Sequence, residues 1–211
     1  MDESDFLTTF QVHVARIFFG LKASDGYVVA GGAGLLASDL IARPTEDLDL
    51  FASAPISSVI EAKTALVRAL HHRQYEVTAI QDSPTFCRLI VRHKDSEVLV
   101  DLAIDSPPSR TPTMTMLGPT LAPLELAGRK LLALFGRAEA RDFADAYVLA
   151  QRFGKDALLE QAQSLDAGFD RDVLAQMIGT LGRFADDEIP LAASELPAAK
   201  AFFTAWAKEL R

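Results

Sequence analysis

The sequence predicts an α+β protein, with a mixed sheet and flanking helices in the first half and helices alone in the second. Two observations predict this class. Short apolar runs typical of strands alternate with helical patterns up to residue 104, whereas the periodic segments beyond residue 119 are all helical in spacing. Between them lies DSPPSRTPT (105–113), a polar and proline-rich stretch typical of a boundary or crossing loop. We therefore expect two domains, residues 1–118 and 119–211.

The elements of the first half are expected from the spacing of its apolar residues. Phe6, Phe10 and Val14 begin an apolar stripe at helical spacing, and Ser57 or Ser58 is the expected cap of a later helix. In chain order we expect a helix at 5–21, a strand at 27–32, a helix at 33–41, a strand at 47–53, a helix at 56–72, and strands at 75–80, 85–92 and 97–104. The last three strands are spaced as in a meander or a mixed sheet.

The second half is expected to contain five helices. Its apolar residues recur at intervals of three and four, and Gly136 separates the first two helices. The expected helices span 121–135, 138–153, 155–164, 170–183 and 196–210.

The composition is that of a globular protein without a membrane segment. Of the 211 residues, 49% are hydrophobic and 24% charged, and no apolar run approaches the roughly 18 residues of a membrane span. The first residues are acidic and lack the apolar core of a secretory signal. The single cysteine, Cys87, cannot form an internal disulfide. We therefore expect a protein of the reducing cytoplasm with no membrane partner.

The charge is acidic overall but basic in one stretch. A net charge of −8 argues against nucleic-acid binding through the bulk electric field. Between Arg129 and Lys155, however, six basic residues accompany three acidic ones. This stretch suits a phosphate-bearing substrate; the alternative is a solvated helical face with ion pairs along it.

Asp47 and Asp49 are the first candidate site residues. They stand two positions apart in an expected strand, which places both carboxylates on one face, roughly 6–7 Å apart along the chain. Two carboxylates this close need a cation, a proton or screening by water. Mg²⁺ binds such oxygens together with substrate phosphates. The alternative is a strand edge that faces solvent.

Asp101 interrupts the apolar run VLVDLAI, where an acid is costly unless it is paired or ligates a metal. If its strand neighbours that of Asp47 and Asp49, three carboxylates converge in the arrangement that holds two metal ions for phosphoryl or nucleotidyl transfer. The alternative places Asp101 at the outer end of its strand, facing water.

Gly31 and Gly32 lie in AGGAG, between an expected strand and an expected helix. Glycine there allows a tight turn and a close approach of the backbone to a phosphate, with amides at the helix N-terminus as anion donors. The spacing matches neither a Walker A loop nor a dinucleotide-binding fingerprint.

The order of these features resembles the DNA-polymerase-β-like nucleotidyltransferase superfamily: strand, two glycines, short helix, RPTEDLDLF (43–51), and a later strand with one aspartate. LELAGRKLLALFGRAEARDFADAYVL (124–149) is similar to the second signature of the AbiEii/MenT nucleotidyltransferase-like toxins of bacterial abortive-infection and toxin–antitoxin systems. The resemblance covers residues 25–155 in the family's order. At Ala33, where many superfamily members have Ser or Thr, this chain lacks one hydroxyl that would contact phosphate.

The resemblance implies roles for residues of both halves. Asp47 and Asp49 would hold Mg²⁺ and the triphosphate of an NTP, with Asp101 as the third ligand of a two-metal site, while Gly31 and Gly32 approach the phosphates. The residues implied in the helical domain are Lys130, a cation for the triphosphate, Asp142, a second essential acid beside it, and Arg137 and Arg141, supporting contacts to phosphate or RNA. The alternative for Lys130 is a surface lysine that packs its stem and exposes its charge.

Thr45 stands two positions before Asp47. On the resemblance its hydroxyl lies near the metal and phosphates, and phosphorylation would add roughly −1.5 to −2 charge and block triphosphate binding. The alternative is that Thr45 caps the turn into the strand.

The implied function is Mg²⁺-dependent transfer of a nucleotide from an NTP to an RNA acceptor, with the 3′ end of tRNA expected. The protein would stop translation as a toxin and have a cognate antitoxin. One alternative is a small-molecule nucleotidyltransferase with an aminoglycoside-like acceptor, against which the signature in the helical half speaks. Another is an inactive, nucleotidyltransferase-like binding module, against which the intact Asp47, Asp49, Lys130 and Asp142 argue.

Overall fold

The computed structural model describes residues 6–53 and 57–211, which fold into two compact units. The first unit ends at Ala122 and the second begins at Pro123. The sequence places the division earlier, after residue 118. The difference arises because Gly118–Thr120 belongs to the sheet although it shows no strand pattern.

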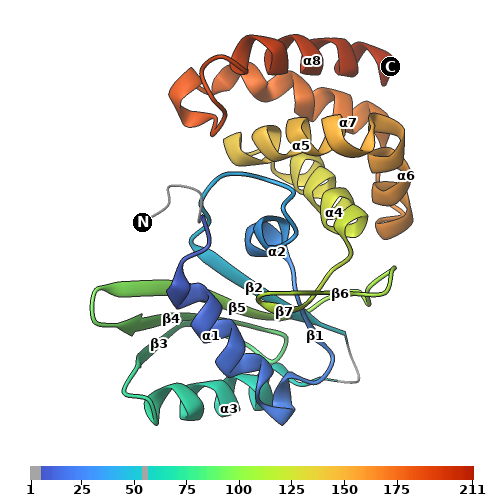
Figure 1. The fold of residues 1–211 in the computed structure, drawn as a ribbon. Helices are drawn as coiled ribbons and strands as arrows, with labels where there is room; N and C mark the ends of the chain where they lie inside the picture. Colours follow the sequence, from blue (N-terminus) through green and yellow to red (C-terminus); the bar gives the residue numbers. More distant parts are fainter. Residues whose placement is uncertain (1–5, 54–56) are drawn as a thin grey trace. The chain divides into compact units, whose positions relative to one another are not determined.

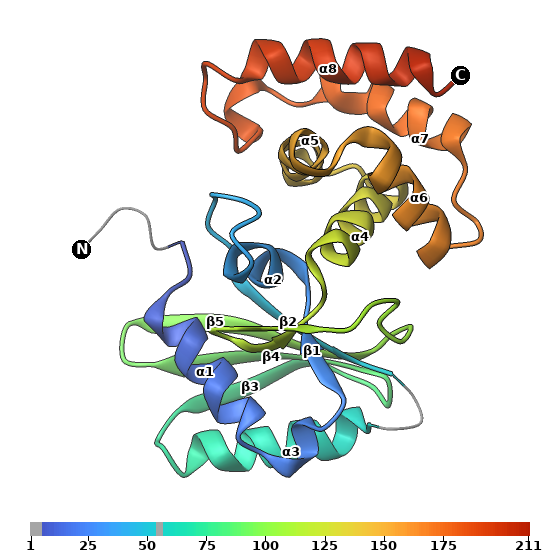
Figure 2. The ribbon, with the colours of Figure 1, turned by 45° about the vertical axis from the view of Figure 1, so that its right-hand side comes forward.

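The described part of the first unit is built on a seven-stranded sheet with helices on both faces (Figure 1). The strands are β1 Tyr27–Val29, β2 Asp47–Ala52, β3 Glu76–Asp82, β4 Phe86–His93, β5 Ser96–Ile104, β6 Thr113–Thr115 and β7 Gly118–Thr120. The helices are α1 Thr9–Phe19, α2 Gly31–Ala37 and α3 Val59–His71, with a 3-10 turn, η1, at Lys22–Ser24. Helices α1 and α3 cover one face of the sheet, and α2 lies on the other (Figures 1 and 2).

The strands stand in the order β3-β4-β5-β2-β1-β7-β6 and pair in both directions, so the sheet is mixed, as expected. β3, β4 and β5 form an antiparallel meander, and β5 pairs in parallel with the central strand β2. The alternation expected for β2 is present. Leu48 and Leu50 are fully buried, while Asp47 and Asp49 point to the opposite face and are half-buried.

Capping side chains start two helices of this unit. A capping box at Thr8 starts α1, and the Oγ of Ser58 accepts a hydrogen bond from the backbone N–H of Glu61 at the start of α3. The sequence predicts that these helices begin at residues 5 and 56, which lie outside the described residues.

The prediction for the glycine turn is wrong in its boundaries. The sequence predicts a strand as far as residue 32 and a helix at 33–41, whereas α2 begins at Gly31 and ends at Ala37. The helix ends early because Asp39 has a φ of +54°, a left-handed conformation that does not occur within a right-handed helix. Both glycines of the turn therefore stand in the first turn of α2.

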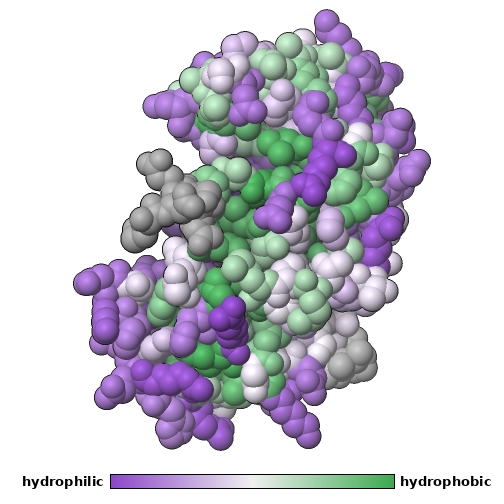
Figure 3. Space-filling view, viewed as in Figure 1, coloured by the Kyte–Doolittle hydropathy of each residue, from purple (hydrophilic) through white to green (hydrophobic). Residues whose placement is uncertain are grey.

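β3 forms one edge of the sheet. Most of its residues are exposed, and hydrophilic residues gather over β3 and the neighbouring β4 in Figure 3. An edge strand offers unpaired backbone groups to other chains, and polar side chains there disfavour such pairing.

The second unit consists of helices, as the sequence predicts. Its elements are α4 Pro123–Gly136, α5 Ala140–Phe153, α6 Lys155–Leu165, α7 Arg171–Ile178, the 3-10 turns η2 Gly179–Arg183 and η3 Asp186–Glu188, and α8 Leu196–Glu209. The helix expected at 170–183 is divided at Gly179, where the chain tightens into η2; glycine has a low α-helix propensity. The rings of Phe143, Phe203 and Trp206 pack together in the core.

Across residues 6–53 and 57–211, no helix combines the length and the apolar composition that a bilayer-spanning segment needs.

Candidate active site

Asp47 and Asp49 project from β2 on the side of the sheet that carries α2. β2 is a central strand, between β5 and β1, so the alternative of a solvent-facing strand edge does not hold. Leu48 and Leu50 are buried on the opposite side of the strand and fix its orientation. Both acids are therefore held on one face by the packing of their apolar neighbours.

Gly31 and Gly32 bring the first turn of α2 against these acids. Gly31 has a φ of +58°, and a Cβ on it would lie 1.6 Å from Oδ2 of Asp49. A Cβ on Gly32 would lie 2.7 Å from Oγ1 of Thr45. The backbone N–H of Ala30 donates a hydrogen bond to the carbonyl of Asp49 over 2.9 Å and ties the turn to β2. A side chain at either glycine would displace an acidic or hydroxyl neighbour.

Asp101 lies beside Asp49 on the neighbouring strand. The two residues are paired in the parallel register of β2 and β5, so their side chains share a face. Arg88 stands opposite Asp101 on β4. Its Nε and Nη2 donate hydrogen bonds to Oδ1 and Oδ2 of Asp101 over 2.7 and 2.5 Å. Asp101 is 4% exposed, so the alternative of a water-facing strand end is wrong.

These three acids, Asp47, Asp49 and Asp101, are called the acidic face below. All three acids raise the pKa of the Arg88 guanidinium. The hydrogen bonds to Asp101 raise the pKa of Arg88, and the negative charges of Asp101, Asp47 and Asp49 raise it further, which together outweigh its partial burial. Arg88 is therefore a cation of the acidic face that is fixed by Asp101, the most buried of the three acids.

Thr45 is fixed through its backbone. Nε2 of the buried Gln11, on α1, donates a hydrogen bond to the carbonyl oxygen of Thr45 over 2.7 Å. The hydroxyl of Thr45 lies against Gly32 and makes no hydrogen bond within the described part of the chain. The structure thus gives no support to the alternative in which this hydroxyl caps the turn.

In the second unit, two buried carboxylates hold Lys130. Its Nζ lies 3.0 Å from Oδ2 of Asp145 and 3.4 Å from Oδ1 of Asp142. The lysine is 8% exposed, and both aspartates are almost completely buried. Lys130 comes from α4, and the two aspartates stand three positions apart on one side of α5. The alternative of a surface lysine is therefore wrong, and the ammonium group has a fixed position.

Asp142 also binds Arg137. The Nε and Nη2 of Arg137 donate to the two oxygens of Asp142 over 2.9 and 3.1 Å, and the backbone N–H of Glu139 donates over 3.2 Å. Burial alone would raise the pKa of Asp142, but the hydrogen bonds from Arg137 and the charge of Lys130 outweigh it and lower that pKa. Asp142 is therefore held in its charged form.

The remaining predicted cations lie in the loop between α4 and α5 (Arg137) and in the first turn of α5 (Arg141). Arg137 and Arg141 are both partly exposed, and Nε of Arg141 donates to Glu139 over 2.9 Å. Arg183, from η2, donates to the carbonyl oxygen of Ala138 over 2.7 Å, where the loop takes a φ of +49°. The C-terminal segment, for which the sequence suggests no role, thus braces the loop. The residues of this ion network are Lys130, Arg137, Glu139, Arg141, Asp142 and Asp145.

The predicted three-carboxylate metal site is not assembled as such. In the described residues, no three side chains of His, Cys, Asp or Glu form a group able to hold a metal ion. The reason at the acidic face is that both oxygens of Asp101 are engaged by Arg88. Asp47 and Asp49 are hard oxygen donors on one face, and the pair suits a Mg²⁺ ion whose remaining ligands are phosphate oxygens and water.

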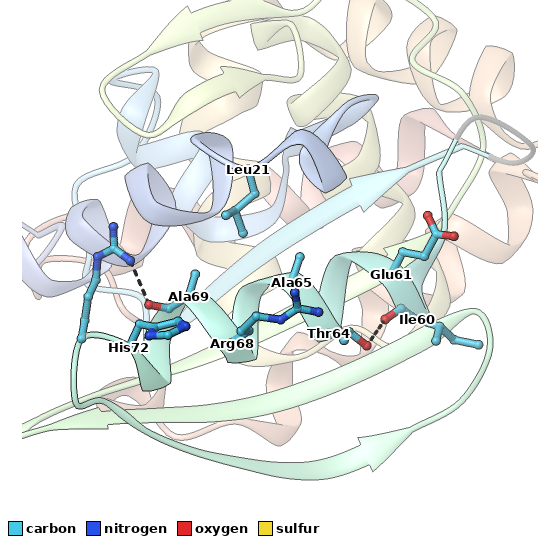
Figure 4. A pocket seen from close by; sticks show the side chains of 9 residues that line it. Leu21, Ile60, Glu61, Thr64, Ala65, Arg68, Ala69 and His72 are labelled. Atoms are coloured by element: carbon cyan, nitrogen blue, oxygen red, sulfur yellow. Dashed lines mark hydrogen bonds between the residues drawn. The ribbon is translucent and has the colours of Figure 1, made fainter.

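A separate hollow of about 640 Å³ lies along α3 (Figure 4). Leu21 and Ile60 contribute its apolar lining, and Glu61, Arg68 and Arg73 its charges. Because α3 covers the sheet face opposite α2, this hollow is not part of the acidic face. Glu61, the one carboxylate among the described residues that line the hollow, cannot supply the paired oxygens of a metal site, so size alone does not make the hollow the candidate active site.

The D-x-D pair on the central strand, with a glycine turn packed against it, is the arrangement expected from the resemblance to nucleotidyltransferases. A model of the family described as "Nucleotidyl transferase AbiEii toxin, Type IV TA system" matches residues 16–208. The chain therefore belongs to this family of nucleotidyltransferase toxins. The recognition of the family from RPTEDLDLF and the signature at 124–149 is confirmed.

Solved structures agree with the fold. The chain is similar to JHP933 from Helicobacter pylori, with 18% identity, a TM-score of 0.59, and coverage of 97% of this chain and 93% of that one. For a putative nucleotidyltransferase from H. pylori, the identity is 17% and the TM-score 0.57, with coverage of 97% of this chain and 97% of that one. For MenT4, a nucleotidyltransferase toxin from Mycobacterium tuberculosis H37Rv, the identity is 16% and the TM-score 0.52, with coverage of 97% of this chain and 91% of that one. No curated protein sequence matches the chain.

Sequence reasoning missed three charged residues of these clusters as site candidates: Arg88, Glu139 and Asp145. A signal exists for Arg88 and for Asp145. Arg88 is a charge in the apolar run TFCRLIVR, and the hairpin register places it opposite the charge in VLVDLAI. Asp145 follows Asp142 at the i+3 spacing that puts both on one side of a helix.

Proposed function

We propose that the protein transfers a nucleotide from a Mg²⁺-bound NTP to the 3′ end of an RNA, with tRNA as the expected acceptor. Family membership shows a nucleotidyltransferase toxin with an antitoxin partner. The observation that carries the finer proposal is the pairing of two unlike charged clusters in one chain: an acidic face that suits a metal ion, and an ion network that contains three cations.

The acidic face binds the metal in this proposal. Asp47 and Asp49 hold Mg²⁺, which when bound neutralises phosphate charge and polarises the phosphorus under attack. Gly31 and Gly32 leave the backbone of α2 bare beside Asp49, so that phosphate oxygens approach closely. The acceptor hydroxyl releases its proton to solvent as its oxygen forms a bond to the α-phosphorus, and pyrophosphate leaves with the electron pair of the broken P–O bond.

The ion network serves the same reaction from the helical unit. Lys130 contacts the triphosphate, and Asp142 and Asp145 fix its ammonium group beforehand, so that little entropy is lost on binding. Arg137 and Arg141 expose guanidinium nitrogens that suit phosphates of the triphosphate or of RNA. These local cations explain how a chain of net charge −8 binds polyanions.

Thr45 is proposed as a site at which phosphorylation silences the protein. Its hydroxyl is half-buried beside Gly32, and a phosphate there would add negative charge next to Asp47 and Asp49. A Thr45→Glu variant should lose transfer, while Thr45→Val should keep most of it. Full transfer by Thr45→Glu would contradict this role.

The acceptor class is tested by incubating the protein with Mg²⁺, each labelled NTP, and either total RNA or a panel of hydroxylated small molecules. Label in RNA that is lost in Asp47→Asn supports the proposal. Label in small molecules alone would identify a small-molecule nucleotidyltransferase, and no label would identify an inactive binding module. Growth arrest on expression in a cytoplasm, relieved by Asp47→Asn, would connect transfer with toxicity.

A further inference from the structure

Arg88 is a charged residue of the acidic face to which the proposed function assigns no role. Its side chain is 40% exposed, whereas its partner Asp101 is 6% exposed. Nε and Nη2 of Arg88 are used by Asp101, and within residues 6–53 and 57–211 its third guanidinium nitrogen, Nη1, makes no hydrogen bond. A buried acid therefore fixes an arginine that still has donors to offer.

The same pair disfavours a second metal ion at Asp101. A carboxylate that accepts two charge-assisted hydrogen bonds has its charge largely neutralised. A divalent cation on that carboxylate would also stand within a few ångströms of the guanidinium and be repelled by it. Arg88 makes its hydrogen bonds to Asp101, and the proposed function assigns the metal to the half-buried pair Asp47 and Asp49.

We propose that Arg88, fixed by Asp101, is a built-in cation of the acidic face that takes the place of a second metal ion. One divalent cation binds at Asp47 and Asp49, and Arg88 donates to a phosphate of the nucleotide. Asp101 is thus a positioning residue, which acts through Arg88. This inference rests on the proposed function, because it assumes that the acidic face receives a metal-bound NTP.

The test uses the full chain with the double variant Arg88→Gln/Asp101→Asn, which leaves the net charge unchanged. Its amide side chains can still form a hydrogen bond across β4 and β5, so the sheet is preserved. The matched control is Arg92→Gln/Glu97→Gln, a paired and exposed arginine and glutamate on the same two strands. Mn²⁺ alone is counted by electron paramagnetic resonance, and binding of each Mg²⁺-NTP is measured by calorimetry.

The expected result differs between Mn²⁺ alone and Mg²⁺-NTP. Wild type and both double variants bind one Mn²⁺ ion per chain, with dissociation constants within about threefold of each other. The Arg88→Gln/Asp101→Asn variant binds Mg²⁺-NTP about tenfold more weakly, because one charge-assisted hydrogen bond is lost. The control pair binds it as wild type does.

Failure of this inference differs from failure of the proposed function. If the Arg88→Gln/Asp101→Asn variant loses Mn²⁺ as strongly as Asp49→Asn does, Asp101 is a metal ligand and the inference is overturned. Wild-type affinity of the variant for both Mn²⁺ and Mg²⁺-NTP also overturns it, since the pair would then only support the sheet. Binding as expected in a protein that labels no acceptor supports the inference and refutes the proposed transfer.

Discussion

The acidic face of the first unit and the ion network of the second differ in how their acids are held. Asp47 and Asp49 of the acidic face are half-buried, and Arg88 makes its hydrogen bonds to their neighbour Asp101. In the ion network, the almost completely buried Asp142 and Asp145 hold Lys130, and Asp142 also binds Arg137. In the proposed function the acidic face is completed by a metal ion, whereas the ion network is fixed beforehand. Removing an acid should therefore have opposite effects on stability in the two regions.

Loss of an acid from the acidic face should abolish activity and spare the fold. Asp49→Asn is expected to lower the rate of nucleotide transfer by about 10³-fold or more, because the metal loses a ligand. The melting temperature should stay the same or rise, since like charges are removed. Transfer assays and thermal unfolding measure both quantities. Glu76→Gln, an exposed acid on β3, is the control and should change neither.

Loss of an acid from the ion network should unfold the protein more easily. Asp142→Ala removes one of the two buried acids that hold Lys130, and the buried acid that binds Arg137, and is expected to cost about 3 kcal/mol of unfolding free energy. Urea unfolding followed by circular dichroism measures this loss. Glu160→Ala, an exposed acid on α6, should stay within about 0.5 kcal/mol of wild type. An equal loss of unfolding free energy in Asp142→Ala and Glu160→Ala would show that the ion network does not stabilise the fold as expected.

The approach of α2 to the acidic face can be tested at its first residue. Gly31→Ala is expected to cost about 2 kcal/mol, because its φ is positive and the new Cβ would overlap Asp49. Gly136→Ala is the control. Apart from its chain neighbours and the backbone of its own helix, no atom of the described residues lies within 4 Å of the position of its Cβ, so Gly136→Ala should be neutral or stabilising by up to about 1 kcal/mol. A neutral Gly31→Ala would show that the turn does not need glycine.

A smaller effect is expected in the pH dependence of stability, which should differ between wild type and Asp142→Asn. The pKa of Asp142 is lower in the folded chain than its ordinary value of 3.8, so the unfolded chain takes up a proton first as the pH falls. Its contribution to stability is complete above that ordinary value and declines at lower pH. Urea unfolding between pH 5 and pH 3 should therefore show a steeper loss in wild type than in Asp142→Asn. Parallel curves would mean that Asp142 is not held by Arg137 and Lys130.

The elements that the sequence predicts correctly have patterns that can be seen within a short stretch of the chain. The five helices of the second unit have apolar residues at regular spacing, and the D-x-D strand has an alternation that any register would preserve. Burial of Leu48 and Leu50 is enough to put Asp47 and Asp49 on one face. Such features depend on residues close in sequence.

What the sequence could not show depends on contacts between distant segments. Arg88 neutralises Asp101 because of a hairpin register, which is set by the whole meander. Gly31 is needed because α2 packs against Asp49, eighteen positions along the chain. β6 and β7 are strands of three residues, too short for a period to be seen.

The central claim is that the acidic face and the ion network serve one reaction. The most direct test is the rate of label transfer from NTP to RNA by Asp49→Asn, Lys130→Gln and the double variant, each shown by circular dichroism to be folded at the assay temperature. We predict that each single variant loses about 10³-fold or more and that the double variant loses little beyond that, as for groups that act as a unit. A folded Lys130→Gln protein that transfers nucleotides at the wild-type rate would contradict the claim.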